Sequence, residues 1–232
     1  YIIGNWKMNG STSELEKRIE ILDTIKTEHR IVICPPFTML NIKSDHVEFG
    51  AQDISMHDHG SYTGEVSGQM IAQTGAKYVI VGHSERRKFH NETNEMVRAK
   101  AQQAIKNGLT PIICIGEPID QTDAGKTHEV IERDRRGSIP NDVKSKIMVA
   151  YEPRWSLGTG IIPTIDDIAK AHNLIADILE TMGLGGTAIL YGGSVNAENG
   201  PGIMATPNVD GALIGTSFLK METFVPIIEN VE

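Results

Sequence analysis

Short apolar runs alternate with longer amphipathic stretches from one end of this chain to the other. Runs rich in isoleucine and valine are typical of strands that are buried on both faces. We predict strands at Ile2–Asn5, Ile31–Cys34, Glu48–Gln52, Tyr78–Gly82, Pro111–Ile115, Ile147–Tyr151, Ala188–Tyr191 and Ala212–Gly215. A helix is predicted after each strand, at Ser13–Lys26, Pro36–Ile42, Gly68–Thr74, Asn94–Asn107, Thr127–Arg136, Thr164–Met182, Ala197–Ala205 and Met221–Val231.

The helical period is clearest in the sixth of these helices, where Ile168, His172, Ile175 and Leu179 fall on one face. The fifth is the weakest, because Glu132–Gly137 carries almost no apolar side chain that could enter a core. We therefore expect the fifth helix to be short, exposed or irregular.

Repeated strand–helix units predict a parallel sheet, and eight of them within 232 residues predict closure of that sheet into a (β/α)8 barrel. No linker or low-complexity segment interrupts the alternation, so we expect residues 1–232 to form one α/β barrel domain. An open, doubly wound sheet is the alternative arrangement.

Composition and charge limit the classes of function that this chain can have. The formal net charge is −8, which argues against a nucleic-acid-binding surface and means that an anionic substrate needs positive groups close to it. No stretch approaches the roughly 18 apolar residues of a membrane span, and no signal peptide is recognisable. Cys34 and Cys114 lie far apart in apolar runs, so we expect buried, reduced thiols and a cytoplasmic protein.

Polar residues gather where the predicted strands end. In a parallel barrel these positions line one common mouth, which is where such folds bind ligands. Asn5 and Lys7 follow the first strand, His83 the fourth and Glu152 the sixth. Taken singly, Lys7 is equally explained as a rim cation and His83 as a core histidine. Their convergence with a glutamate favours a catalytic site.

Glu152 lies between an apolar strand and a segment that has the composition of a hinged loop. Pro153 ends the strand, while Gly158 and Gly160 give the backbone freedom farther along. We interpret this segment as an acid followed by a lid that excludes water from the site. By itself, the same pattern would also fit a strand, an exposed glutamate and a glycine turn.

Two glycine-containing turns are candidates for a phosphate site. Gly192-Gly193-Ser194 and Gly215-Thr216 follow the seventh and eighth strands, where barrels often bind phosphate. We expect a helix to begin near Asn196 and to point its N–H groups and its positive dipole end at the anion. His57-Asp58-His59 lacks further ligands at zinc spacing, so we expect no metal.

This set of groups favours proton abstraction next to a carbonyl in a phosphorylated substrate. A carboxylate at Glu152 would be the base, and His83 would donate a hydrogen bond to the carbonyl oxygen as charge develops on it. Lys7 would add fixed positive charge beside the substrate oxygens.

Six segments resemble, in order, the signatures of the triosephosphate isomerase family. They are Asn5-Trp6-Lys7-Met8-Asn9, Tyr62-Thr63-Gly64-Glu65, Gly82-His83-Ser84-Glu85-Arg86-Arg87, Cys114-Ile115-Gly116-Glu117, the run Ala150–Gly160 and Tyr191-Gly192-Gly193-Ser194-Val195. The resemblance covers nearly the whole chain. It implies the interconversion of dihydroxyacetone phosphate and D-glyceraldehyde 3-phosphate, in glycolysis and gluconeogenesis, without a cofactor or metal.

The resemblance also implies roles for individual residues. Glu152 would be the base, His83 the electrophile, and Lys7 and Asn5 substrate-binding groups. The phosphate would lie among Gly158, Gly192, Gly193, Ser194, Gly215 and Thr216, and the supporting residues would be Glu85, Cys114 and Thr63. The family forms homodimers, so the loop Gln52–Gly68 would enter the neighbouring subunit and bring Thr63 near its site.

Three positions depart from the family pattern. Thr216 stands where a second glycine is usual, Arg154 replaces an apolar residue beside the lid, and Arg135 lies near the place of an apolar residue in the fifth helix. A sugar-phosphate epimerase would instead place metal ligands or paired acids at several strand ends. A non-catalytic descendant would have lost the Lys–His–Glu set, which is intact here.

Overall fold

The computed structural model describes residues 1–232 except for 117–126, 142, 144–145, 155–162 and 232. Eight parallel strands pair in sequence order, and the first pairs with the last to close a barrel. The strands are β1 Ile2–Asn5, β2 Ile31–Cys34, β3 Glu48–Ala51, β4 Tyr78–Val81, β5 Thr110–Ile115, β6 Met148–Tyr151, β7 Ala188–Tyr191 and β8 Gly211–Ile214. The predicted (β/α)8 barrel is confirmed, and the open-sheet alternative is wrong.

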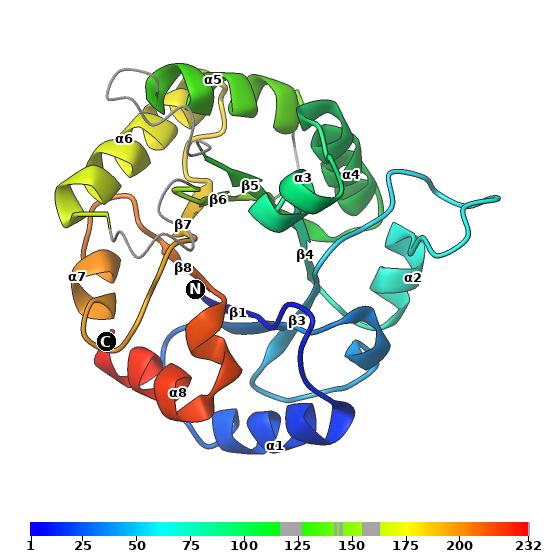
Figure 1. Ribbon diagram of the computed structural model, residues 1–232, viewed down its shortest axis with the longest axis vertical. Coiled ribbons are helices and arrows are strands. Elements are labelled where there is room, and N and C mark those ends of the chain that lie inside the picture. Colours follow the sequence, from blue (N-terminus) through cyan, green and yellow to red (C-terminus); the bar gives the residue numbers. More distant parts are fainter. Residues whose placement is uncertain (117–126, 142, 144–145, 155–162, 232) are drawn as a thin grey trace.

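Helices surround the strands (Figure 1). They are α1 Thr12–Leu22, α2 Gly68–Gln73, α3 Ser84–Phe89, α4 Asn94–Lys106, α5 Thr127–Ser138, α6 Ile165–Thr181, α7 Gly200–Met204 and α8 Met221–Asn230, with the 3-10 helices η1 Phe37–Met39 and η3 Thr216–Leu219. None of the described helices is both long and apolar enough to span a bilayer.

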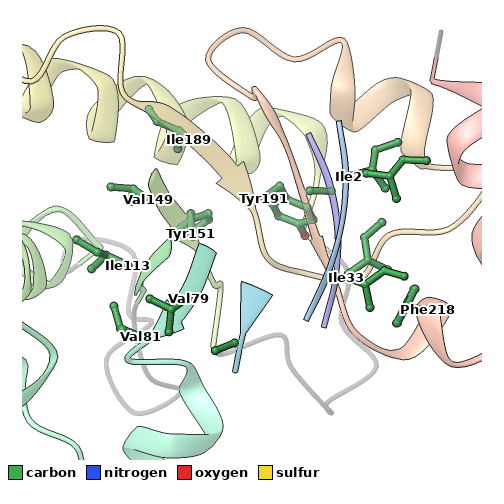
Figure 2. Close-up of a cluster of buried hydrophobic side chains, with 14 of the residues drawn as sticks. Ile2, Ile33, Val79, Val81, Ile113, Val149, Tyr151, Ile189, Tyr191 and Phe218 are labelled. Carbon is green, nitrogen blue, oxygen red and sulfur yellow. The ribbon is translucent and has the colours of Figure 1, made fainter. Parts of the chain in front are cut away.

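Alternation along each strand divides the core in two. Ile3, Val32 and Ile80 belong to a cluster inside the barrel. Their neighbours, such as Ile2 and Ile33, face outward and pack against the helices in a second, larger cluster (Figure 2). Because successive side chains of a strand point to opposite faces, the inward series continues beyond each strand end to the mouth of the barrel.

Two helix predictions are wrong in part. The stretch predicted as a helix at Pro36–Ile42 contains only η1, because its buried residues Met39 and Leu40 are adjacent and do not form a helical stripe. The helix predicted at Ala197–Ala205 begins only at Gly200. The side chains of Asn196 and Asn199 bind the backbone N–H groups just before it, and this capped turn leads into the helix.

The prediction for the fifth helix is also wrong. Helix α5 has 12 residues and is a regular α-helix. Among its described side chains, Ile131, Asp134 and Ser138 are buried, so an inward stripe exists and contains polar residues. Gly137 lies against Asn94 of α4, where a Cβ atom at position 137 would come within 2.4 Å of the Asn94 Cβ. The helix is therefore held by polar contacts that the apolar pattern of the sequence does not reveal.

Candidate functional site

A cavity of about 960 Å³ opens at the carboxyl ends of the strands. The inward series of β1, β6, β7 and β8 ends there in Asn5, Glu152, Gly192 and Gly215. The lining also includes Lys7, His83, Ser84, Glu85, Arg87, Lys88, Phe89, Arg154, Gly193, Ser194, Val195, Asn196, Leu213, Ile214, Thr216 and Ser217. The structure thus brings most of the predicted site residues together at one mouth.

The carboxylate of Glu152 is buried and bound by the start of α3. The backbone N–H of Ser84 donates to one of its oxygens at 2.9 Å, and the Ser84 hydroxyl donates to the other at 3.0 Å. Nε2 of His83 lies 3.1 Å from that second oxygen. The Glu152 carboxylate and the His83 imidazole are therefore direct neighbours.

His83 is the residue immediately before α3, and a hydrogen bond to its ring indicates its tautomer. The backbone N–H of Glu85 donates to Nδ1 at 3.3 Å, so Nδ1 carries no proton in this arrangement. Nε2 then carries the proton and faces Glu152. A neutral imidazole with its N–H directed into the cavity is suited to donate a hydrogen bond to a substrate oxygen.

Lys7 adopts the left-handed backbone conformation, with φ of 55°. The side-chain oxygen of Asn5 accepts from the Lys7 N–H at 3.1 Å, and the Gln52 amide donates to the Lys7 carbonyl at 2.8 Å. The ammonium of Lys7 lies 2.7 Å from the Glu85 carboxylate. These contacts hold a strained backbone so that the cation lies at the mouth of the cavity.

The glycine turn after β7 is a candidate anion site, but for a reason other than the predicted one. The helix that we expected to begin near Asn196 begins at Gly200, and the Asn196 N–H is occupied by the Asn199 side chain. The N–H groups of Gly193 and Ser194 have no hydrogen-bond partner among the described residues. These two donors, rather than a helix end, are available to a phosphate.

The turn after β8 lies beside Lys7. A Cβ atom at Gly215 would come within 3.0 Å of the Lys7 side chain, so glycine lets the backbone approach the cation closely. Thr216 is exposed and begins η3. Its side chain is thus accessible at this turn.

The remaining predicted site residues lie away from the cavity or outside the described residues. Cys114 is fully buried on β5, where burial and then the charge of nearby Glu152 raise the pKa of its thiol well above the usual value. Thr63 is exposed in the loop 52–67, which projects from the barrel (Figure 1). Gly158 lies outside the described residues, together with most of the predicted lid.

Arg87 is a partly buried contributor that the sequence pattern does not single out. Its guanidinium donates to the carbonyl of Gly82 at 2.8 Å and to that of Cys114 at 3.1 Å, so it joins the ends of β4 and β5. It also donates to the Asn94 side chain at 2.6 Å. Burial lowers the pKa of Arg87, with the nearby Asp134 carboxylate opposing that effect. The position of Arg87 in the sequence, four residues after His83, is the signal that could have indicated its role.

Comparison with known proteins identifies the family. The family described as triosephosphate isomerase matches residues 1–231. The chain belongs to the triosephosphate isomerase family. The triosephosphate isomerase of Cutibacterium acnes is 45% identical over 249 residues, which cover 97% of this chain and 95% of the relative. That of Gluconacetobacter diazotrophicus is 41% identical over 239 residues, covering 98% and 96% respectively.

A solved structure agrees with these relatives. The crystal structure of triosephosphate isomerase from Bartonella henselae matches with a TM-score of 0.88 and 35% identity, covering 99% of this chain and 97% of that one. The predicted membership of the triosephosphate isomerase family is therefore confirmed. Among the described residues, no group of three or more His, Cys, Asp or Glu side chains is arranged to hold a metal ion. His57, considered above as a ligand, stacks on Tyr62 with ring centroids 3.8 Å apart.

Proposed function

We propose that this chain interconverts dihydroxyacetone phosphate and D-glyceraldehyde 3-phosphate, a step of glycolysis and gluconeogenesis. The observation that carries the proposal is the meeting of three groups at one mouth. The Lys7 ammonium, the His83 imidazole and the Glu152 carboxylate all line the same cavity. The names of the relatives support the same reaction.

Glu152 acts as the base. Its carboxylate takes a proton from the carbon next to the carbonyl, and the electron pair left behind forms an enediolate whose charge lies on the former carbonyl oxygen. The Nε2–H of His83 donates a hydrogen bond to that oxygen, and the Lys7 ammonium stabilises the negative charge. The proton of the neighbouring hydroxyl then moves to that oxygen, and Glu152 returns its own proton to the former carbonyl carbon, which completes the isomerisation and regenerates the carboxylate.

The bonds between Glu152 and Ser84 define a resting position of the base. Both carboxylate oxygens accept hydrogen bonds from Ser84, so the carboxylate leaves this residue to reach a substrate carbon. Its backbone stays in place, because the Glu152 N–H donates to the carbonyl of Ile115 at 2.8 Å. Rotation of the side chain alone therefore carries the base into the cavity.

The phosphate of the substrate binds at the turns after β7 and β8. Gly193 and Ser194 supply free N–H donors, and Thr216 supplies a hydroxyl. Lys7 lies beside Gly215 and adds positive charge, which a chain of net charge −8 must supply locally.

A coupled assay for glyceraldehyde 3-phosphate isomerisation tests the activity, and Glu152→Asp tests the base. Shortening the side chain by one methylene misplaces the carboxylate by about 1 Å, a shift that can cost about 100-fold in rate. We expect a large fall in kcat with little change in KM, because the phosphate contacts remain. Near-normal turnover of Glu152→Asp would contradict the assignment of the base, while inactivity of the unaltered chain would contradict the proposed reaction.

We further propose that the chain acts as a homodimer in the cytosol. The projecting loop 52–67 and the exposed apolar side chains of Met8, Tyr62 and Phe89 support a contact between subunits, with Thr63 reaching the neighbouring site. Cys34 and Cys114 are free and buried, which suits a reducing compartment. Sedimentation equilibrium of the unaltered chain and of Tyr62→Asp tests the dimer. A monomeric unaltered chain would contradict it.

A further inference from the structure

Arg154, a departure from the family pattern, pairs with a residue of the polar fifth helix. Its guanidinium lies 2.7 Å from the carboxylate of Asp134. The Asp134 side chain is only 3% exposed, and that of Arg154 is 17% exposed. Two polar residues that the sequence pattern leaves unexplained are thus partners across 20 positions of the chain.

This pair joins a longer series of bonds. The other oxygen of Asp134 accepts from the Asn94 amide at 3.3 Å, and the Asn94 oxygen accepts from Arg87 at 2.6 Å. Arg87 in turn donates to the carbonyl of Gly82, the residue directly before His83. One hydrogen-bond network therefore holds both the segment that follows Glu152 and the segment that precedes His83.

The backbone around Glu152 is fixed on both sides. The Glu152 N–H is bound to β5, and its carbonyl lies so close to Gly116 that a Cβ atom there would come within 1.7 Å of the carbonyl oxygen. Pro153 restricts the next φ angle, and Arg154 is tied to α5. Three consecutive residues thus have restrained positions, which leaves the side chain of Glu152 as the moving part.

We propose that Arg154 and Asp134 are positioning residues for the isomerisation, which set the place of the base Glu152 relative to His83. This inference rests on the proposed function, since it takes Glu152 as the base. A buried ion pair adds little net stability, because the desolvation of both charges offsets their attraction. The pair acts on geometry, and a displacement of about 1 Å at a base can cost up to about 100-fold in rate.

Arg154 also lines the cavity, so direct contact with the substrate is the rival explanation. The variant Asp134→Asn distinguishes the two explanations, because it breaks the ion pair and leaves the Arg154 charge in place. If the pair positions the base, Arg154→Met and Asp134→Asn each lower kcat by about 10- to 100-fold with KM nearly unchanged. The double variant then loses less than the product of the two single losses, since both substitutions remove the Arg154–Asp134 interaction.

Arg154→Lys keeps the charge and restores part of the loss. The matched control is Lys170→Met, which removes an ion pair with Asp166 on the exposed face of α6 and leaves kcat unchanged. Thermal unfolding of each variant identifies the folded ones and sets an assay temperature below their transitions. Normal kcat in a folded Arg154→Met or Asp134→Asn variant would overturn the inference, as would a raised KM confined to Arg154→Met. The Glu152→Asp result decides the proposed function separately.

Discussion

The Nζ atom of Lys7 lies 2.7 Å from Oε1 of Glu85, although 78 positions separate the two residues. Both side chains are partly exposed, at 34% and 45%. An ion pair in such a setting adds little to stability, so its effect is to orient the ammonium. The contact places a cation of the loop after β1 against the start of α3, next to His83 and Glu152.

Replacing Lys7 by methionine keeps most of the side-chain volume and removes the charge. We expect kcat/KM to fall by about 100-fold or more, because the developing oxyanion loses a charged partner. Lys77→Met is the matched control, since Lys77 also pairs with a glutamate but lies before β4, at the opposite end of the strand. Steady-state kinetics of the two variants make the comparison. Equal activity in both would exclude Lys7 from the reaction.

Gly193 leaves no room for a side chain. A Cβ atom there would lie 2.2 Å from the hydroxyl of the buried Tyr191. We expect Gly193→Ala to displace the proposed phosphate-binding turn and to raise KM, with a lower unfolding temperature because Tyr191 shifts as well. Gly202→Ala is the control in α7, which lies between the same two strands, β7 and β8. The added Cβ there would meet only Ile165, at 3.6 Å. A KM that stays normal in Gly193→Ala would show that this turn does not bind the substrate.

Arg18 joins α1 to η3, the segment that follows β8. Its guanidinium lies 4.7 Å from the ring centroid of Trp6 and donates to the carbonyls of Phe218 and Leu219 at 2.9 and 2.6 Å. Arg18→Met leaves these carbonyls without their donor, so we expect the free energy of unfolding to fall by about 2–4 kcal/mol. Urea denaturation measures the loss. An unchanged midpoint and slope would mean that water replaces the guanidinium at no cost.

His172 is fully buried between α6 and the sheet, and burial lowers the pKa of its imidazole. The unfolded chain therefore takes up the proton at a higher pH than the folded chain does. The stabilisation by neutral His172 is complete above the unfolded pKa of about 6.5 and is lost as pH falls from there toward the lowered folded pKa. The slope reaches at most about 1.4 kcal/mol per pH unit.

The variant His172→Asn tests whether His172 causes the loss of folding stability at acid pH. The ring atom Nδ1 lies 2.8 Å from the carbonyl of Asn208, and an asparagine amide can donate from nearly the same place without titrating. We expect the variant to be less stable at neutral pH but to lose less of its stability between pH 6.5 and 5. Parallel curves of unfolding free energy against pH for both proteins would rule out His172 as the source.

Much of the barrel could be predicted because its determinants are local. β1, β2 and β7 have the predicted bounds, since each is a short, mostly apolar run that is followed by a polar or glycine-containing turn. The same alternation that places Ile3 inside the barrel places Asn5 at its mouth. The positions of Asn5 and Glu152 therefore follow from a period of two residues and from the parallel direction of the strands.

The sequence by itself determined the repeating strands and helices, the closed arrangement and the side of the barrel at which polar groups collect. Only the tertiary structure decided how the polar positions are used. The buried Asp134 carboxylate is compensated by its neighbour Arg133 and, above all, by Arg154 and Asn94, which are distant in sequence and supply an opposite charge and a donor. The cost of burying a polar group depends on partners that folding brings together, so no local pattern reveals it.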